Sequence, residues 1–257
     1  MDVLRKLLQA VDSGDTCVLA TVAGVRGSAP RKDAARLLVS ARGLVCGTVG
    51  GGEVETGALA AASEMLAGPD NGRLLEIATN CGGVVTVMLE KFAPGRRLLV
   101  VGAGHVGRAV AVAGSHAGYR VTVASPGASE RTQAIAGCES VAADDPVVLD
   151  RWENPERTQV VVATGDADAD TAWAVAALAR PFAGVGVVGS RNKAAAIRHT
   201  AAGAGVRPDR IHTLRCPVGL DLGAVTPEEI AVSIVAELIR LDRTGEVPEG
   251  WRRASRG

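Results

Sequence analysis

The chain has 257 residues, 47% of them hydrophobic and 2% aromatic, and its 28 Lys and Arg balance its 28 Asp and Glu. This composition is typical of a globular protein with a sizeable core, not of a disordered chain. With no basic excess and few aromatic rings, the sequence disfavours nucleic-acid binding. No run of about eighteen apolar residues occurs, so we expect no association with a membrane.

The five cysteines are scattered, odd in number and form no C-x-x-C pair. Such usage suits a reducing compartment better than a disulfide framework. The chain also shows no charged-then-apolar N-terminal signal. We therefore expect a cytoplasmic protein.

Residues 1–94 are predicted to form a small N-terminal α/β domain. An amphipathic helix over 1–12 and three strands precede Gly50-Gly51-Gly52, and a helix is expected directly after it. Three consecutive glycines cost backbone entropy, which indicates a close approach to the backbone. Because a helix N-terminus attracts anions, Gly50, Gly51 and Gly52 are candidate cofactor-binding residues. A tight strand-to-helix turn is the alternative interpretation.

Two further strands flank the segment Asn80-Cys81-Gly82-Gly83. A cysteine between an Asn and two glycines is expected in an accessible turn. Its thiol could serve as a ligand or nucleophile if its pKa is lowered, so Cys81 is a candidate cofactor and metal ligand. The alternative is a small residue in a tight turn.

Residues 96–243 are predicted to form a Rossmann-like domain with a parallel sheet, followed by a tail over 244–257. The run before Gly102 is apolar on both faces, as a central parallel strand requires. Gly102, Gly104 and Gly107 fit G-x-G-x-x-G. In that motif the first glycine makes a tight turn, the second leaves room for a pyrophosphate and the third allows close helix packing.

The next strand ends in Ser125-Pro126-Gly127, without the acidic residue that usually binds the adenosine ribose. Two interpretations remain open. Ser125, with Ser129 and Arg131, could receive the 2′-phosphate of NADP. Otherwise the adenine half of a dinucleotide is not bound in the usual way.

Other candidates follow later strands, because ligands of open α/β sheets bind at the carboxyl ends of the strands. Asp166 is a candidate proton donor, although Asp also caps helices well. Ser190, Arg191 and Lys193 could hold an anionic group. After a strand expected over 210–214, a glycine-rich loop is expected to bury Asp221, which we take as a further cofactor-binding candidate.

Taken in order, these motifs resemble the XdhC/CoxI family, whose members are accessory factors for xanthine dehydrogenase and related molybdenum hydroxylases. The matching segments are Gly27–Arg31, Gly47–Glu55, Cys81–Gly83, Gly102–Val106, Gly189–Lys193 and Pro217–Ile234. The resemblance implies a small α/β domain, a Rossmann domain and a homodimer. It also implies binding of molybdenum cofactor, its sulfuration with a cysteine desulfurase and its delivery to an apo-enzyme.

The cofactor is a phosphorylated pterin, so the resemblance gives the glycine-rich segments a phosphate to hold and Cys81 a molybdenum to shield or ligate. Two segments depart from the family pattern. The family tends to have Asp-x-Arg where this chain has Ser125-Pro126-Gly127. It tends to have Thr-His-x-His where this chain has Thr164–Ala167.

Three functions therefore stay open. The first is a molybdenum cofactor chaperone. The second is an NAD- or NADP-dependent oxidoreductase with His105 or Asp166 as proton donor. The third is a ligand-sensing scaffold that binds a nucleotide without turnover. In each case the ligand is expected in a crevice between the two domains, with the Gly102–Gly107 turn as one wall and His105 beside it.

Overall fold

The computed structural model describes residues 2–27, 34–125 and 135–251. The chain divides into two compact units, Met1–Pro94 and Gly95–Gly257, called unit 1 and unit 2 below. Among the described residues, no helix is long and apolar enough to cross a membrane.

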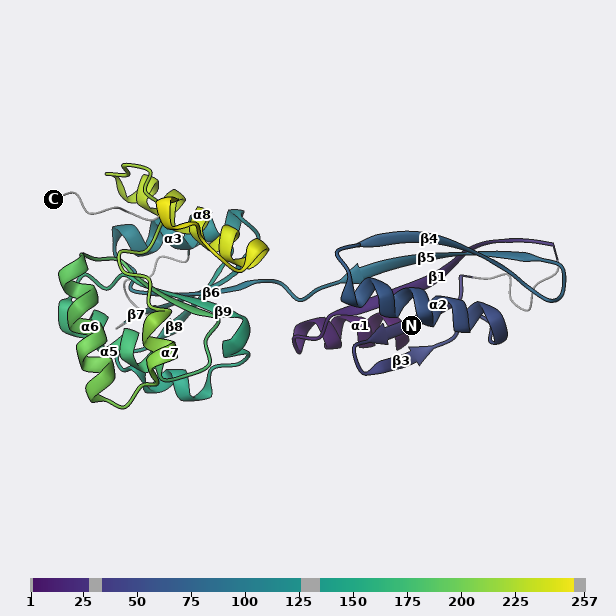
Figure 1. Ribbon diagram of the computed structural model, residues 1–257, viewed down its shortest axis with the longest axis horizontal. Helices are drawn as coiled ribbons and strands as arrows, with labels where there is room; N and C mark the ends of the chain where they lie inside the picture. Colours follow the sequence, from purple (N-terminus) through teal and green to yellow (C-terminus); the bar gives the residue numbers. More distant parts are fainter. Residues whose placement is uncertain (1, 28–33, 126–134, 252–257) are drawn as a thin grey trace. The chain divides into compact units, whose positions relative to one another are not determined.

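Unit 1 is a five-stranded antiparallel sheet with strand order β3-β2-β1-β5-β4 (Figure 1). Helix α2 (Gly52–Ala67) covers one face and α1 (Asp2–Asp12) packs on the other. The strands are β1 (Cys17–Arg26), β2 (Arg36–Ser40), β3 (Gly43–Gly47), β4 (Gly72–Ala78) and β5 (Val84–Phe92).

Side-chain alternation along β1 explains the two layers of unit 1. Successive residues of a strand point to opposite faces, so Val18 and Ala20 pack under α2 while Leu19 packs under α1. The predicted first helix is confirmed, but its apolar face is only partly covered. Leu7 is buried and Leu8 is 65% exposed, so one side of α1 contacts the sheet, mainly at β1, β2 and β3.

Unit 2 is a parallel sheet with strand order β10-β9-β6-β7-β8, the arrangement of a Rossmann fold. The expected α/β fold class is confirmed. The strands are β6 (Arg97–Val101), β7 (Arg120–Ser125), β8 (Cys138–Ala142), β9 (Thr158–Val162) and β10 (Gly184–Val187). The first strand in sequence is central, so both halves of the sheet turn away from it.

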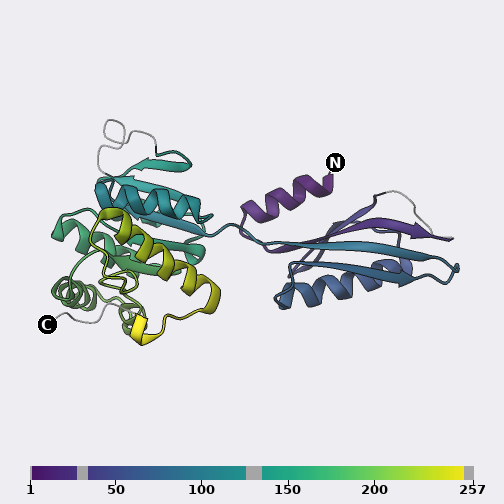
Figure 2. The same cartoon turned by 90° about the horizontal axis from the view of Figure 1, so that it is seen from above.

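Helices cover both faces of this sheet (Figures 1 and 2). One face carries α3 (His105–His116) and α8 (Pro227–Thr244), and the other carries α5 (Ala167–Leu178) and α6 (Arg191–Gly203). Short helical segments complete the unit: η1 (Pro146–Arg151), η2 (Pro155–Arg157), α7 (Pro208–His212) and η3 (Glu249–Trp251).

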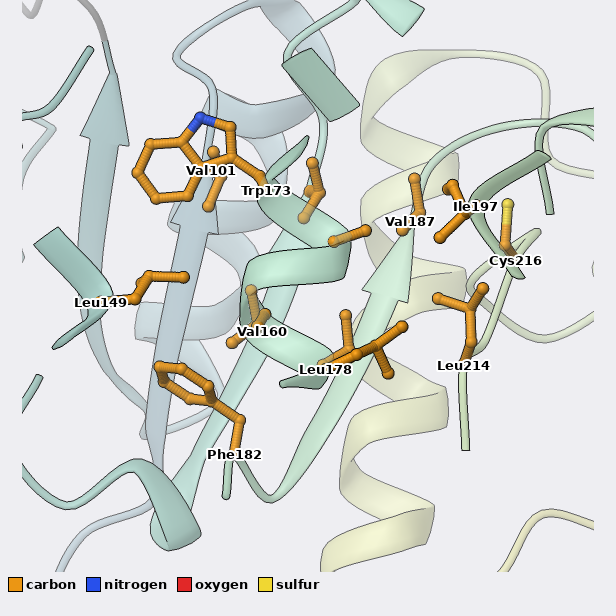
Figure 3. Packing of buried hydrophobic residues seen from close by; sticks show 14 of the residues in the cluster. Val101, Leu149, Val160, Trp173, Leu178, Phe182, Val187, Ile197, Leu214 and Cys216 are labelled. Atoms are coloured by element: carbon orange, nitrogen blue, oxygen red, sulfur yellow. The ribbon is translucent and has the colours of Figure 1, made fainter. Parts of the chain in front are cut away.

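The core beneath α5 uses the few large rings of the chain. Trp173 and Leu178 of α5 pack with Phe182 against Val160 of β9 (Figure 3). The opposite face is filled by smaller aliphatic residues such as Val110 and Ile234. Both layers need β6 and β9 to be apolar on both faces, which is what the sequence shows.

One expected element meets a different outcome. The strand expected over 210–214 is wrong: Pro208–His212 is helix α7, and Arg215 alone bridges to Gly186. Pro at the first helical position and Asp209 in the first turn favour that helix start.

A buried polar network ties α8 to the amino ends of the strands in unit 2. Arg215 Nη1 lies 3.5 Å from Glu237 Oε1, and Arg215 Nη2 donates to Gln159 Oε1 at 2.9 Å. Glu237 also accepts a hydrogen bond from the backbone N–H of Gly219. All three side chains are at most 7% exposed, so each charge depends on its partners.

Replacing Glu237 by Ala leaves the buried guanidinium of Arg215 without its carboxylate. We expect the free energy of unfolding of unit 2 to fall by about 3 to 5 kcal/mol. All three tryptophans lie in unit 2, so their fluorescence during urea denaturation reports on this unit. Glu228→Ala on the exposed start of the same helix is the control, with a loss of about 1 kcal/mol or less. Equal losses for the two variants would contradict the assignment.

Candidate functional site

The β4–β5 turn of unit 1 lies beside the first turn of α2. Glu53 accepts hydrogen bonds from the backbone N–H of Asn80 at 3.3 Å and from its side-chain amide. Cys81 is the next residue along the chain and is exposed. The structure thus brings the candidate thiol next to the glycine segment from which α2 starts.

That glycine segment needs glycine for its backbone. Gly50, Gly51 and Gly52 have φ angles of 123°, 76° and 56°, a region that other residues rarely adopt. A Cβ on Gly51 or Gly52 would meet open space. Thr48 orders the segment, since its hydroxyl accepts from Gly50 N at 3.2 Å and donates to Glu55 at 2.6 Å.

A third segment reaches the same turn. Gly27, at the end of β1, has φ of 76°, and a Cβ there would lie 3.2 Å from the carbonyl oxygen of Gly82. Residues 28–33, which continue this motif, lie outside the described residues. Three sequence motifs separated by more than 20 residues therefore converge around the 79–83 turn.

In unit 2, the three glycines of the turn after β6 have different reasons to be glycine. Gly102 has φ of 106°, and a Cβ there would lie 2.4 Å from the carbonyl oxygen of Ala163. A Cβ on Gly107 would lie 2.0 Å from the carbonyl oxygen of Gly102. Gly104 caps α3 with an ordinary φ of −70°, and a Cβ there would meet nothing. Neither backbone nor packing explains Gly104, which leaves room for a ligand at this helix start.

Asp166 and Ser190 act as helix caps. Asp166 Oδ1 accepts from Ala169 N at 2.8 Å, at the start of α5. Ser190 Oγ accepts from Lys193 N at 3.3 Å, at the start of α6. Both remain predicted ligand contacts, in addition to this structural role.

Asp170 holds the ammonium group of Lys193. This carboxylate is fully buried, and its Oδ2 accepts from Lys193 Nζ at 2.6 Å. Its Oδ1 accepts from the N–H and hydroxyl of Thr164 at 2.9 and 2.6 Å. The predicted anion contact of Lys193 therefore competes with a partner inside the protein. The sequence analysis missed this pair, since no spacing rule connects residues 23 apart.

Cys216 lies at the same end of the sheet. Its Sγ approaches the carbonyl oxygen of Ser190 at 3.5 Å, and burial raises the pKa of the thiol to about 11. Arg191 is exposed at the start of α6, and Ser125 is buried at the end of β7. Ser129 and Arg131, the expected companions of Ser125, lie outside the described residues.

The expectation of a buried Asp221 is wrong. Its side chain is exposed, and its backbone N–H donates to the carbonyl oxygen of Trp251 at 2.9 Å. The apolar residues Val218 and Leu220 take the interior positions of this loop, so Asp221 turns outward. His105 is also exposed, as the first residue of α3.

Within the described ranges, no group of three or more His, Cys, Asp or Glu side chains could hold a metal ion. The assignment of Cys81 as a metal ligand stays a prediction. On that prediction, the Cys81 thiol would add one ligand to a metal that a bound cofactor already holds.

Cys81 is the exposed cysteine of the five, and we expect it to be alkylated first by iodoacetamide. The thiolate is the reactive form, and burial raises the pKa of Cys17, Cys138 and Cys216. With its pKa of about 11, Cys216 is ionised in only about one molecule in a thousand at pH 8. Peptide mass mapping over time measures the order. If Cys216 were labelled as fast as Cys81 in the folded protein, the predicted order of alkylation would be refuted.

Two family models match the chain. The XdhC Rossmann domain model matches residues 98–238, and the XdhC and CoxI family model matches residues 10–77. The uncharacterized protein YqeB of Escherichia coli (strain K12) is 29% identical over 257 residues, which cover 94% of this chain and 46% of the relative.

Two further similarities are more limited. The molybdenum cofactor insertion chaperone PaoD of Escherichia coli (strain K12) is 34% identical over 107 residues, 38% of this chain and 34% of the relative. The chain thus spans less than half the length of these curated relatives. A solved structure described as a xanthine dehydrogenase from Bacillus halodurans has a TM-score of 0.52 at 20% identity, covering 96% of this chain and 98% of that one, which shows a shared fold. Because the XdhC Rossmann domain model matches more than half of this chain, the chain belongs to the XdhC/CoxI family.

Proposed function

We propose that the chain is an accessory factor that binds molybdenum cofactor and assists its sulfuration and insertion into a xanthine dehydrogenase-type molybdenum hydroxylase. One observation carries the proposal: Gly27, the Gly50–Gly52 segment and Cys81 converge around one turn of unit 1. Membership of the XdhC/CoxI family and the similarity to PaoD support it. The partners on this proposal are an apo-hydroxylase, a cysteine desulfurase and a second copy of the chain.

The chemistry of the cofactor suits the residues present. A pterin ring offers N–H donors, and the carboxylates of Glu53 and Glu55 lie at the start of α2 as acceptors. A phosphate needs N–H donors and room, which the Gly50–Gly52 segment offers at the start of α2. Cys81 would shield or ligate the molybdenum from its exposed turn.

One observation favours the alternative of an NAD- or NADP-dependent oxidoreductase. The Gly102–Gly107 turn follows the central strand of a parallel sheet, where dinucleotides bind in Rossmann folds. The two functions differ in their ligand, so thermal shift with molybdopterin, NADH and NADPH in turn separates them. Stabilisation by NADPH alone would reject the cofactor chaperone.

Gly104→Ala tests the dinucleotide alternative. The backbone conformation of Gly104 suits alanine, and the added Cβ meets no atom of the described residues, so we expect unchanged stability. The methyl group would enter the space left for a pyrophosphate and weaken NADPH binding about tenfold or more. Gly203→Ala adds a methyl group in the same unit, again into open space, and should bind NADPH as the unchanged chain does. Calorimetric titration of both variants with NADPH measures the difference, and equal affinity would remove Gly104 from the site.

Cys81→Ser tests the thiol with little change in size. We expect the variant to fold normally, because the side chain is exposed, and to lose bound molybdenum during gel filtration. Cys138→Ser is the control, since that half-buried thiol lies in unit 2. Molybdenum per chain, measured by mass spectrometry after loading, gives the answer. Equal retention in the two variants would exclude Cys81 as a ligand.

A further inference from the structure

A pocket of about 460 Å³ lies between α3 and the first turns of α8 in unit 2. The two helices pack side by side on one face of the parallel sheet (Figures 1 and 2). The volume falls within the range of about 300 to 1,000 Å³ that is usual for small-molecule sites. None of the motifs discussed above requires a hollow at this place.

The pocket exists because the helices carry small side chains where they meet. Ala109 and Ala113 lie one turn apart on the same face of α3, and Ala231 faces them from α8. Val112 and Val232 also line it and are 42% and 56% exposed. The walls are therefore apolar, and no side chain of the described residues fills the space between them.

The polar groups of the lining are mostly basic. Arg108, His105 and His116 belong to α3, and Glu228 of α8 is the one acidic group among the lining residues. No ion pair joins Arg108 to Glu228, both of which lie in the described part of the chain. The guanidinium is thus available near the N-terminal end of α3, where the helix dipole also favours negative charge.

We propose that this pocket binds a small, largely apolar molecule that carries one anionic group. The apolar body lies over Ala109 and Ala113, and the anionic group lies beside Arg108 and His105. Apart from His105, these residues are separate from those assigned to molybdenum cofactor, so the site is an addition to the proposed function and does not depend on it.

The probe is 8-anilinonaphthalene-1-sulfonate, an apolar anion, compared with its uncharged analogue N-phenyl-1-naphthylamine. Both are titrated into the full chain and followed by fluorescence. We expect saturable binding at one site per chain. Ala113→Leu fills the pocket and should weaken both probes at least tenfold, while Ala113→Ser keeps the volume and should bind both. Unchanged binding to Ala113→Leu would overturn the proposal.

The charge of the ligand is tested by two opposite changes. Arg108→Gln removes an attractive charge and should weaken the sulfonate several-fold. Glu228→Gln removes a repulsive one and should strengthen it. Neither should alter binding of the uncharged analogue. The reverse signs would show that the pocket prefers cations and would overturn the anionic assignment.

An exposed variant guards against effects on folding. Val232→Glu adds a carboxylate at the rim of the pocket, on a side chain that is already 56% exposed, and should weaken the sulfonate. Val147→Glu makes the same change on η1, at a side chain that is 65% exposed. This variant should bind the sulfonate as tightly as the unchanged chain. Equal effects of the two substitutions would mean that the probe binds elsewhere, and would reject the pocket.

Discussion

The contact between Gly107 and Gly102 fixes much of unit 2. A Cβ on Gly107 would lie 2.0 Å from the carbonyl oxygen of Gly102, so α3 can start directly after the central strand only with glycine at this position. This start aligns α3 along β6, and α8 packs beside it. The open space at Gly104 lies in the same turn, and the pocket lies where α3 meets α8.

At the amino ends of the strands in unit 2, the position of α8 depends on buried charged groups. Arg215, Glu237 and Gln159 are buried together, and Gly219 donates to Glu237 from the loop that precedes α8. A buried charge without its partner costs several kcal/mol, so this network selects a single position for α8. In unit 2, α3 is thus positioned by a backbone contact and α8 by a polar network.

The sequence predicted the local features well and the long-range pairs poorly. The apolar run before Gly102 predicted the central strand β6, and the helix expected after the glycine run is α2. Hydrophobic pattern and glycine position are local signals, which is why they sufficed. The pairing of Asp170 with Lys193 joins the first turns of α5 and α6, and no local rule shows it. Asp221 was misjudged because a loop has no side-chain periodicity to indicate which residue turns inward.

The candidate site was predictable to the same extent. The motifs around Gly27, Gly50–Gly52 and Cys81 could be recognised one by one. The antiparallel register of β1 with β5 and of β4 with β5 brings Gly27 to the 79–83 turn. The hydrogen bonds between Glu53 and Asn80 bring the start of α2 to the same turn. A hairpin turn brings together residues that are close in the sequence. Which more distant loop lies beside that turn depends on the strand order of the sheet.

The internal pairs also decide how an anion could be held in unit 2. Lys193, the cation expected at the carboxyl end of the sheet, is neutralised by a fully buried Asp170. The attraction of Lys193 for an anion is therefore weakened, while backbone N–H groups and the dipole of α3 supply attraction that does not depend on it. Such groups act only at short range, which requires the ligand to approach the backbone closely. A glycine with an ordinary φ angle and no packing neighbour, as at Gly104, is what this mode of binding needs.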